Sequence, residues 1–375
     1  MTKKFSLFVA LLMSVSVWAT ELQQVRIYQR ANGGFVAVDA AGEIVGFSST
    51  ARFSEVPESM QSLLQVQGMQ AQVTYEPLPQ AVAEALNDLV IKDSVGPIMD
   101  VHFNQSKPYN LHLPTVGDNH CVTGCVATAM VQVMVYHHHP LQCKGGTKTY
   151  KTADLSLTMN YDYDKYAPDW DNILTDYGNG VSYTDAQADA IAELMKAAGI
   201  SVEMNYNVDG SGTNTEKAAD ALRTYFDFDR DLEYVDNSGV ESEFHNMMQA
   251  EIKANRPMIC SSRPTSGGTG HAYVCDGFLT YEGLEEFPKQ TLYHFNWGWG
   301  GSDDGWFRLN NMKPSFQDLT GSFSVIKGIR PAGSTDLKTV RLEKDMVIYD
   351  ILGRVVEFTQ PGQMYIRGGK KFIAK

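Results

Sequence analysis

The residues best suited to chemistry are a cysteine, a histidine and an asparagine in three separate motifs. Cys125 follows Gly124 and opens the apolar run "GCVATAMVQVMVYHHH", which predicts a buried helix. In the first turn of a helix, unpaired N–H groups and the macrodipole stabilise an anion and lower the pKa of a thiol. A thiolate at Cys125 would be a competent nucleophile. An isolated free cysteine is, however, more often a buried core residue.

Two further readings of Cys125 are a disulfide and a metal site. A disulfide to Cys121 is geometrically awkward across the entry of one helix. A metal site shared with His137 fails on distance, because twelve residues of helix separate the two side chains by roughly 18 Å. The run His137–His139 is followed by Pro140, so it predicts a helix end rather than a metal site.

Two further motifs favour the reading of Cys125 as a nucleophile over that of a core residue. The motif "GGTGHAYVCDGF" places His271 at the start of an apolar strand, and "LYHFNWGWGG" places Asn296 at the end of the next one. If these strands pair, the two side chains can lie side by side. A thiol nucleophile needs a base such as histidine, and the base needs an orienting acceptor. Trp297 and Trp299 could shield that hydrogen bond from water, although core packing alone would also explain them.

The length, composition and charge of the chain limit the number of domains and the classes of partner. The chain has 375 residues, enough for two or three domains, with 43% apolar and 20% charged residues. Its formal net charge of −13 argues against nucleic acid or an anionic membrane as the main partner, since both require basic patches.

The beginning of the chain predicts export. Lys3 and Lys4 precede an apolar run from Phe5 to Val17, and Ala19 offers a small residue for signal peptidase. We therefore expect residues 1–19 to be a cleaved secretory signal and find no other candidate membrane span. An oxidising destination permits disulfides, and five cysteines leave at least one thiol unpaired. Whether Cys121 pairs with one of the others is left open; the candidates are Cys143, Cys260 and Cys275.

The elements that must position these residues follow an α+β order, with helices first and strands after. Thr184 and Gln187 form a capping-box pattern at the start of one helix, which Gly199 ends. The polar segment 92–97 resembles a linker or processing site. The other expected elements are strands at 35–38 and 43–47, a loop-rich stretch at 150–177, helices at 213–226 and 242–254, and strands at 258–262, 271–278, 292–297 and 306–309.

The three motifs together resemble the streptopain family of secreted cysteine proteases, within the papain superfamily. The resemblance extends over roughly residues 25–331, including "GGFVAVDAAGEIVGFSS" in the family's propeptide region. It implies an α+β, papain-like fold with two lobes, one helical and one of antiparallel strands. It also implies a bacterial, secreted or cell-surface cysteine endopeptidase that is made as a zymogen.

The resemblance also implies roles for individual residues. Cys125 would be the nucleophile, His271 the general base and then acid, Asn296 the residue orienting that histidine, and Trp297 the screen around the pair. Asn119 stands six residues before Cys125, where papain-like enzymes usually carry a glutamine that donates to the oxyanion; asparagine is one methylene shorter. Ser261, Gly270 and Trp299 would border the substrate cleft. No cofactor and no metal are expected.

The same resemblance divides the chain into four parts. We expect a signal peptide at 1–19, a propeptide of small α+β type at 20–94, the catalytic domain at 95–331 and a small β module at 332–375. The last part resembles C-terminal sorting modules of secreted Bacteroidetes proteins. The expected partners are protein or peptide substrates, the chain's own propeptide and, through the tail, the secretion machinery.

Two alternatives to a protease remain. The first is a catalytically weak or inactive homologue that acts as a binding or inhibitor module, a reading favoured only by Asn119 and by a short pro-region. The second is an amidase or transglutaminase activity, because one papain-type site can host several acyl transfers.

Overall fold

A computed structural model of the chain describes residues 90–334, except 179, 240, 283–289, 310–311 and 313–318. It also describes eight short strands outside that range, four before it and four after it. The chain divides into two compact units, Met1–Ala332 and Gly333–Lys375. The predicted signal segment lies outside the described residues.

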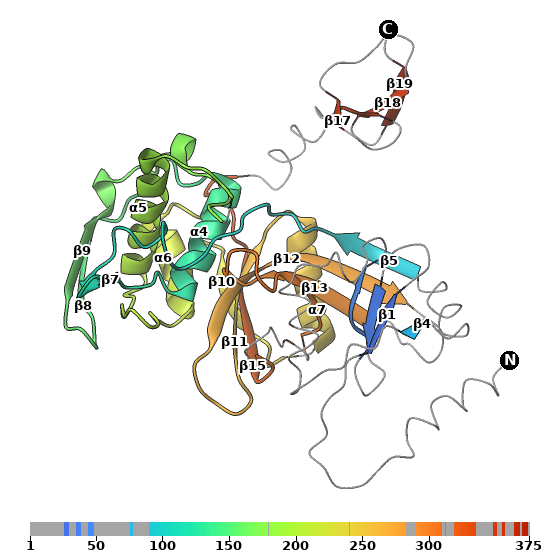
Figure 1. Cartoon of the computed structure of the whole chain (residues 1–375), viewed down its shortest axis with the longest axis horizontal. Coiled ribbons are helices and arrows are strands. Elements are labelled where there is room, and N and C mark those ends of the chain that lie inside the picture. Colours follow the sequence, from blue (N-terminus) through green and yellow to red (C-terminus); the bar gives the residue numbers. More distant parts are fainter. Residues whose placement is uncertain are drawn as a thin grey trace, which may run out of the picture. The chain divides into compact units, whose positions relative to one another are not determined.

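Three helices form the first lobe of the larger unit, drawn in green and yellow-green in Figure 1. They are α4 (Cys125–His137), α5 (Asp185–Ser201) and α6 (Glu216–Tyr225). Every residue of α4 from Val126 to Val135 is buried, because the helix lies between its neighbouring helices and the sheet. The helix ends where His138 adopts a left-handed conformation, as the histidine run predicted.

The polar stretch expected to be loop-rich contains more regular structure than its composition indicated. It begins inside a hairpin of β8 (Thr147–Lys151) and β9 (Thr158–Asp162) and continues with two single-turn 3₁₀ helices, Tyr163–Lys165 and Trp170–Asn172. Alternate residues of β9 are buried, including Met159 and Tyr161. This period-2 burial explains why aromatic residues recur in a segment that looked irregular.

The second lobe is an antiparallel sheet of seven strands among the described residues. Along the sheet the order is β10-β15-β11-β12-β13-β14, and β5 pairs with the far end of β12. Helix α7 (Glu241–Lys253) packs on β12. The strand bounds are β5 Val90–Val95, β10 Glu233–Asp236, β11 Met258–Arg263, β12 His271–Glu282, β13 Gln290–Asn296, β14 Gly305–Phe307 and β15 Ser322–Lys327.

The sheet separates two hydrophobic cores, and strand β12 contributes to both. Ala272 and Val274 belong to the core shared with α4 and the helical lobe. Tyr273 and Cys275 belong to the core shared with α7. Because successive side chains of a strand point to opposite faces, residue parity decides which lobe each side chain meets.

The segment expected to be a linker is a strand instead. Residues Val90–Val95 ("VIKDSV") form β5, which pairs antiparallel with Phe278–Glu282 of β12. Beyond the range in which β11 pairs with it, β12 would leave its backbone groups unpaired on that side, and β5 supplies the missing hydrogen bonds. The polar side chains of Lys92 and Ser94 are exposed, which made the segment look like a loop.

Short strands before and after this body form separate small sheets. The first has the order β3-β2-β1-β4, from β1 (Arg26–Gln29), β2 (Phe35–Val38), β3 (Ile44–Ser48) and β4 (Glu76–Pro77). Strand β3 lies against β14. In the second unit the order is β17-β16-β18-β19, from β16 (Ile348–Asp350), β17 (Val355–Val356), β18 (Met364–Arg367) and β19 (Lys370–Ile373).

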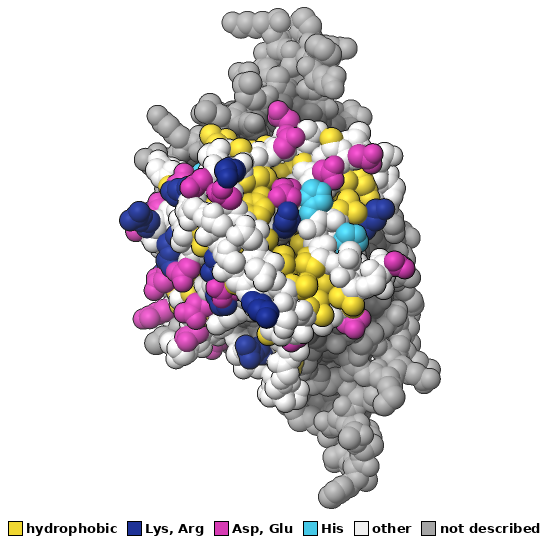
Figure 2. Space-filling view, turned by 90° about the vertical axis from the view of Figure 1, so that its left-hand side faces the viewer, with side chains coloured by type: hydrophobic (Ala, Val, Ile, Leu, Met, Phe, Trp, Pro, Cys, Tyr) yellow, Lys and Arg dark blue, Asp and Glu magenta, His cyan; other side chains and the backbone are white. Residues whose placement is uncertain are grey.

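One face of the described region carries mixed charge. On the face drawn in Figure 2, lysine and arginine side chains are interspersed with aspartate and glutamate. Among the helices that the structure describes, none is both long and apolar enough to cross a membrane. Within the same residues, no group of three or more histidine, cysteine or acidic side chains could hold a metal ion.

The predicted capping box at the start of α5 is confirmed, and it can be tested. Thr184 Oγ1 accepts from Gln187 N at 3.3 Å, and Gln187 Oε1 accepts from Thr184 N at 2.9 Å. The substitution Thr184→Ala should lower the free energy of unfolding by about 1 kcal/mol, measured by urea denaturation. Thr158→Ala, on the exposed edge of β9, is the control for losing a threonine side chain elsewhere. Equal losses for the two variants would contradict the role of the cap.

Candidate active site

Cys125 is the first residue of α4, as the sequence predicted. Gly124 precedes it with φ +83°, in the left-handed region that favours glycine. A Cβ at Gly124 would lie 2.6 Å from Met204 Sδ and 3.0 Å from the Ser211 carbonyl oxygen, so no other residue fits without a shift. The thiol therefore stands at the N-terminus of a buried helix, where N–H groups have no partner within the helix.

Two opposing effects act on the Cys125 thiol. Burial is the larger effect and raises its pKa, whereas the backbone N–H groups of Ala272, Val126 and Cys125 itself lower the pKa. The thiol is consequently neutral at neutral pH when considered alone. The three N–H groups are nevertheless in place to stabilise a thiolate once a base removes the proton.

His271 begins strand β12 and is buried, with 7% of its surface exposed. Its Nε2 lies 2.8 Å from the backbone carbonyl oxygen of Trp297. A carbonyl can only accept, so Nε2 carries the proton and Nδ1 is the basic atom of the neutral ring. Burial lowers the pKa of His271 to about 4, and the bond to the Trp297 carbonyl offsets part of this effect. The imidazole is therefore neutral at pH 7 and able to accept a proton.

Cys125 and His271 line one cavity of about 270 Å³ between the two lobes. Ala272, directly after His271, brings its N–H close to the Cys125 sulfur. Within the described residues the thiol and the imidazole make no direct hydrogen bond to each other. Catalytic contacts are commonly loose without substrate and tighten in the complex. The remaining lining residues are Val126, Ser211, Gly212, Thr213, Asn214, Thr215, Tyr234, Ser261, Ser262, Arg263, Gly268, Thr269, Gly270, Ala272, Ser322 and Ser324.

The expected hydrogen bond between Asn296 and His271 is not the one the structure contains. Asn296 Nδ2 donates to the Val101 carbonyl at 2.5 Å, and its Oδ1 accepts from Gly298 N at 3.1 Å. The sheet register explains the difference, because Asn296 pairs with Val274 and so faces the helical lobe. His271 is three residues before Val274 and has the opposite parity. The backbone carbonyl of Trp297 takes the position expected for the amide.

Trp299 lies closer to the imidazole than Trp297, the residue expected to screen it. Trp299 stacks directly on His271, with ring centroids 4.7 Å apart, while the Trp297 ring is 6.3 Å from the imidazole. Trp297 is fully buried, and its indole N–H donates to the Asp303 carbonyl at 2.9 Å. The Trp297 ring thus belongs to the core beneath the site, and Trp299 is the ring that covers the imidazole.

The other predicted site residues divide into two groups. Ser261 and Gly270 line the cavity, but Asn119 and Trp299 are not among its lining residues. Asn119 is exposed in a short hairpin of β6 (Thr115–Val116) and β7 (Asn119–His120). The expected role of Asn119 as an oxyanion donor stays a prediction.

All five cysteines are free, so the pairings left open for Cys121 do not form. Four are buried, and Cys125 alone is half-buried, which makes it the accessible thiol. Burial also raises the pKa of the Cys143 thiol to about 12 and that of Cys121 above its ordinary value. Of these thiols, Cys125 is the one that the cavity exposes to a ligand.

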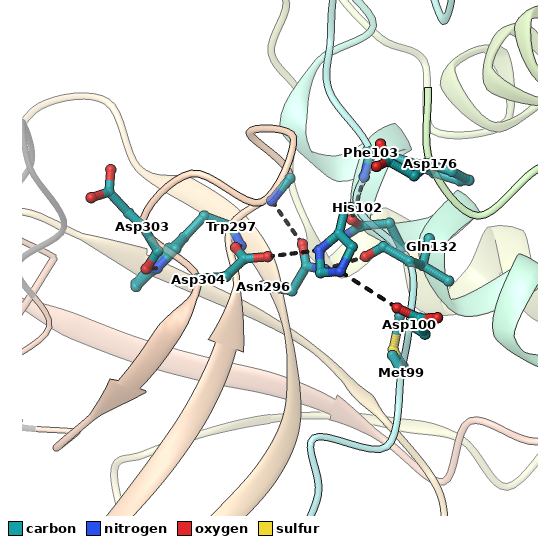
Figure 3. A network of polar contacts seen from close by, with 12 residues as sticks. Met99, Asp100, His102, Phe103, Gln132, Asp176, Asn296, Trp297, Asp303 and Asp304 are labelled. Atoms are coloured by element: carbon teal, nitrogen blue, oxygen red, sulfur yellow. Dashed lines mark hydrogen bonds and ion pairs between the residues drawn. The ribbon is translucent and has the colours of Figure 1, made fainter. Parts of the chain in front are cut away.

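The sequence did not point to the residues around the Trp297 backbone. Figure 3 shows Asp304 and His102 close to the Asn296–Trp297 segment, with His102 on the chain segment that precedes α4. Asp304 Oδ1 accepts from Trp297 N at 2.9 Å, and its Oδ2 lies 3.4 Å from His102 Nδ1. The acidic pair in "GSDDGW" carries no pattern that would have marked Asp304 as part of a site.

Known proteins resemble this chain over most of its length. A model described as the Peptidase C10 family matches residues 103–307. Streptopain of Streptococcus pyogenes is 29% identical over 335 residues, 82% of this chain and 79% of that protein. The thiol protease/hemagglutinin PrtT of Porphyromonas gingivalis is 28% identical over 338 residues, 80% of this chain and 36% of that protein.

Solved structures agree with the sequence relatives. Active interpain A, a cysteine protease of Prevotella intermedia, is 29% identical with a TM-score of 0.56, covering 63% of this chain and 95% of that one. A prointerpain A fragment is 25% identical with a TM-score of 0.58, covering 82% and 98%. These neighbours confirm the predicted papain-like α+β fold.

The protonation states of Cys125 and His271 predict how the alkylation rate of the thiol depends on pH. In the wild-type protein, alkylation of Cys125 by iodoacetamide should persist below pH 6, because His271 stays a neutral base down to about pH 4. In His271→Ala, the rate at pH 7 should fall and should recover only at alkaline pH, because burial raises the pKa of the unassisted thiol. Mass spectrometry of the Cys125 peptide measures both rates.

The control for this measurement is His245→Ala. His245 is on α7, bonded to the Tyr293 hydroxyl, and does not line the cavity. Its replacement should leave the pH profile of alkylation unchanged. If His271→Ala kept the wild-type profile, His271 would not be the base that takes the proton from the thiol.

Proposed function

The chain belongs to the peptidase C10 family and is a cysteine endopeptidase, and from this premise we propose that Cys125 and His271 carry its catalysis. The observation that supports the assignment is their shared cavity, which opens between a helix N-terminus and the start of β12. A nucleophile beside N–H donors and a neutral base held at one ring nitrogen are what acyl transfer requires.

The proposed reaction begins when His271 Nδ1 accepts the proton of the Cys125 thiol. The sulfur then attacks the carbonyl carbon of the scissile peptide bond, and a tetrahedral intermediate forms. As the C–N bond breaks, the imidazolium returns the proton to the leaving amine. Water, deprotonated by the same imidazole, hydrolyses the resulting thioester and frees the acid product.

The positive imidazolium that forms in this cycle is stabilised by two neighbours. The Trp297 carbonyl accepts from Nε2 throughout and becomes a stronger partner when the ring is charged. The face of Trp299 lies against the ring, where a cation is attracted by the aromatic quadrupole. Both effects offset the burial that otherwise disfavours the charged form.

We assign the oxyanion to the N-terminus of α4. The Cys125 N–H points out of the first helical turn, and a negatively charged oxygen is stabilised there by the helix dipole. Asn119 is not part of this proposal because its side chain is exposed on the β6–β7 hairpin. The proposal therefore relies on backbone N–H groups to stabilise the oxyanion.

The substrate is a protein or peptide lying across the cavity between the lobes. The segment Ser211–Thr215 lines one side and Gly268–Gly270 lines another, next to the catalytic pair. A Cβ on Gly270 would lie 2.6 Å from the Ser262 carbonyl oxygen, so the chain needs glycine directly before His271. An extended peptide could hydrogen-bond to the backbone of these segments while its side chains enter the cavity.

We further propose that the enzyme is made as a zymogen, with residues 20–94 as its propeptide. The likeness to prointerpain A supports this division, because it covers more of the chain than the likeness to active interpain A does. The contact between β3 and β14 gives the propeptide a docking place on the β lobe. Since β5 pairs with β12, a cut near residue 94 falls inside a paired strand and requires its local opening.

The proposal for location rests on the two ends of the chain. Residues 1–19 would direct export as a signal peptide, and the catalytic domain at 95–331 would act outside the cytoplasm, in the medium or at the cell surface. The module at 332–375, which contains the β16–β19 sheet, would engage the secretion machinery.

The test of the proposed function is labelling with a peptidyl epoxide. The purified protein should be labelled at Cys125 and should cleave an unfolded protein substrate, whereas Cys125→Ser should do neither. His271→Ala should lose about 10² to 10⁴-fold in kcat, the range expected for losing a general base. Tryptic mapping by mass spectrometry and a casein assay measure the two effects.

The alternative classes give different results in the same assays. An inactive homologue would show labelling spread over all five cysteines, or none, and no cleavage. An amidase or transglutaminase would label at Cys125 but form amine adducts, rather than cleaved peptides, when an amine acceptor is supplied.

A further inference from the structure

A buried carboxylate outside the catalytic pair supports the backbone that holds His271. The Asp304 side chain is 9% exposed, just before strand β14. Burial raises its pKa, and its bonds to His102 and to Trp297 N counter that effect. Burying a carboxylate costs free energy unless hydrogen bonds compensate. The hydrogen-bond partners of Asp304 therefore indicate which part of the structure it stabilises.

Its first partner is the residue whose carbonyl orients the catalytic base. Asp304 Oδ1 accepts from Trp297 N at 2.9 Å, and the Trp297 carbonyl accepts from His271 Nε2 at 2.8 Å. On the other side, Asn296 Oδ1 accepts from Gly298 N at 3.1 Å. Gly298 N and the Trp297 carbonyl belong to one planar peptide unit. The two peptide units of Trp297 are thus fixed from both ends, which sets the direction of the carbonyl.

Its second partner comes from the segment that precedes the catalytic helix. His102 Nδ1 lies 3.4 Å from Asp304 Oδ2, and the backbone N–H of His102 donates to Thr175 at 2.8 Å. The bond to Asp304 raises the pKa of His102, which favours a positive ring beside the carboxylate. Asp100 lies 3.7 Å from the other ring nitrogen and adds to the same effect. The carboxylate is therefore held from the sheet on one side and from the first lobe on the other.

We propose that Asp304 is a positioning residue for catalysis, which fixes the Trp297 backbone so that its carbonyl holds His271 in one tautomer and orientation. This inference rests on the proposed function, because it concerns the same base. His102 supports this role by holding the Asp304 side chain in one rotamer. An error of about 1 Å in the position of a catalytic group can cost about 10²-fold in rate, so a support at this distance from the chemistry can matter.

The chain contains a matched control for this carboxylate. Asp276, on β12, is also buried, also accepts a backbone N–H, from Met99 at 3.1 Å, and also bonds to a histidine, His294, at 2.6 Å. It makes no contact with the Trp297 backbone among the contacts of the described residues. Loss of either carboxylate removes one hydrogen bond from a backbone N–H and one bond to a histidine. Of the two, only Asp304 is connected to His271, through the backbone of Trp297.

The experiment compares three variants, Asp304→Ala, Asp304→Asn and Asp276→Ala. Each is expressed as the full chain and is then activated. Asp304→Ala should lower kcat about tenfold or more with little change in KM, because binding is intact while the base is misoriented. Asp304→Asn keeps an oxygen that can accept from Trp297 N and should recover most of the lost kcat. Asp276→Ala should lower the melting temperature to a similar degree while kcat stays within about twofold of the wild-type value.

The outcomes separate this inference from the proposed function. If Asp304→Ala kept its kcat, or lost no more kcat than Asp276→Ala at an equal loss of melting temperature, Asp304 would be a structural residue only. If Asp304→Ala did not fold, a kcat for Asp304→Asn no higher than one tenth of the wild-type value would also overturn the proposed mode of action. If the wild-type protein were inactive, or His271→Ala stayed active, the assignment of the catalytic pair itself would fail.

Discussion

The hydrogen bond from His271 Nε2 to the Trp297 carbonyl is the interaction on which the site depends. It fixes the proton on one nitrogen and leaves the other as the base, which is the first requirement of the proposed chemistry. The bond exists because β12 and β13 are neighbours in register, with Val274 opposite Asn296. The chain after β13 then passes beside the first residue of β12. A shift of one residue in this register would turn the side chains of one strand to the other face and move the Trp297 carbonyl away from His271.

The loop that carries this carbonyl is tied to the first lobe as well as to the sheet. Asn296 donates to the Val101 carbonyl, and Gly300 N donates to the Phe103 carbonyl at 2.8 Å. The segment that leads into α4 therefore holds the loop whose carbonyl accepts from His271. Cys125 and His271 come from separate lobes, and these bonds keep the two lobes in a fixed relation at the cavity. Each of these polar groups has a partner, which is what a rigid site requires.

The sequence was sufficient to place the residues that are proposed to act through their side chains. Cys125 at a helix start, His271 at a strand start and the Thr184 capping box all follow from local patterns, and the structure has them as predicted. The role of Asn296 could not be read in the same way, because it depends on a strand register that only tertiary packing sets. A backbone acceptor such as the Trp297 carbonyl has no signature in a sequence at all.

Other differences have the same physical origin. The polar strand β5 looked like a linker because its stability comes from pairing with β12 rather than from its own residues. Asn119 matched an expected position by counting, but it is exposed on the β6–β7 hairpin and is not among the residues that line the cavity. Asp304 gains its importance from partners distant in the sequence, His102 among them.

A crystal structure of the activated protein with a peptide aldehyde bound would show whether Cys125 and His271 form the proposed catalytic pair. We expect a covalent bond from Cys125 Sγ to the aldehyde carbon. We also expect His271 Nδ1 within hydrogen-bond distance of the reacting atoms, while Nε2 still donates to the Trp297 carbonyl. An adduct on another cysteine, or a His271 ring whose Nε2 had left the Trp297 carbonyl for the Asn296 amide, would contradict this assignment.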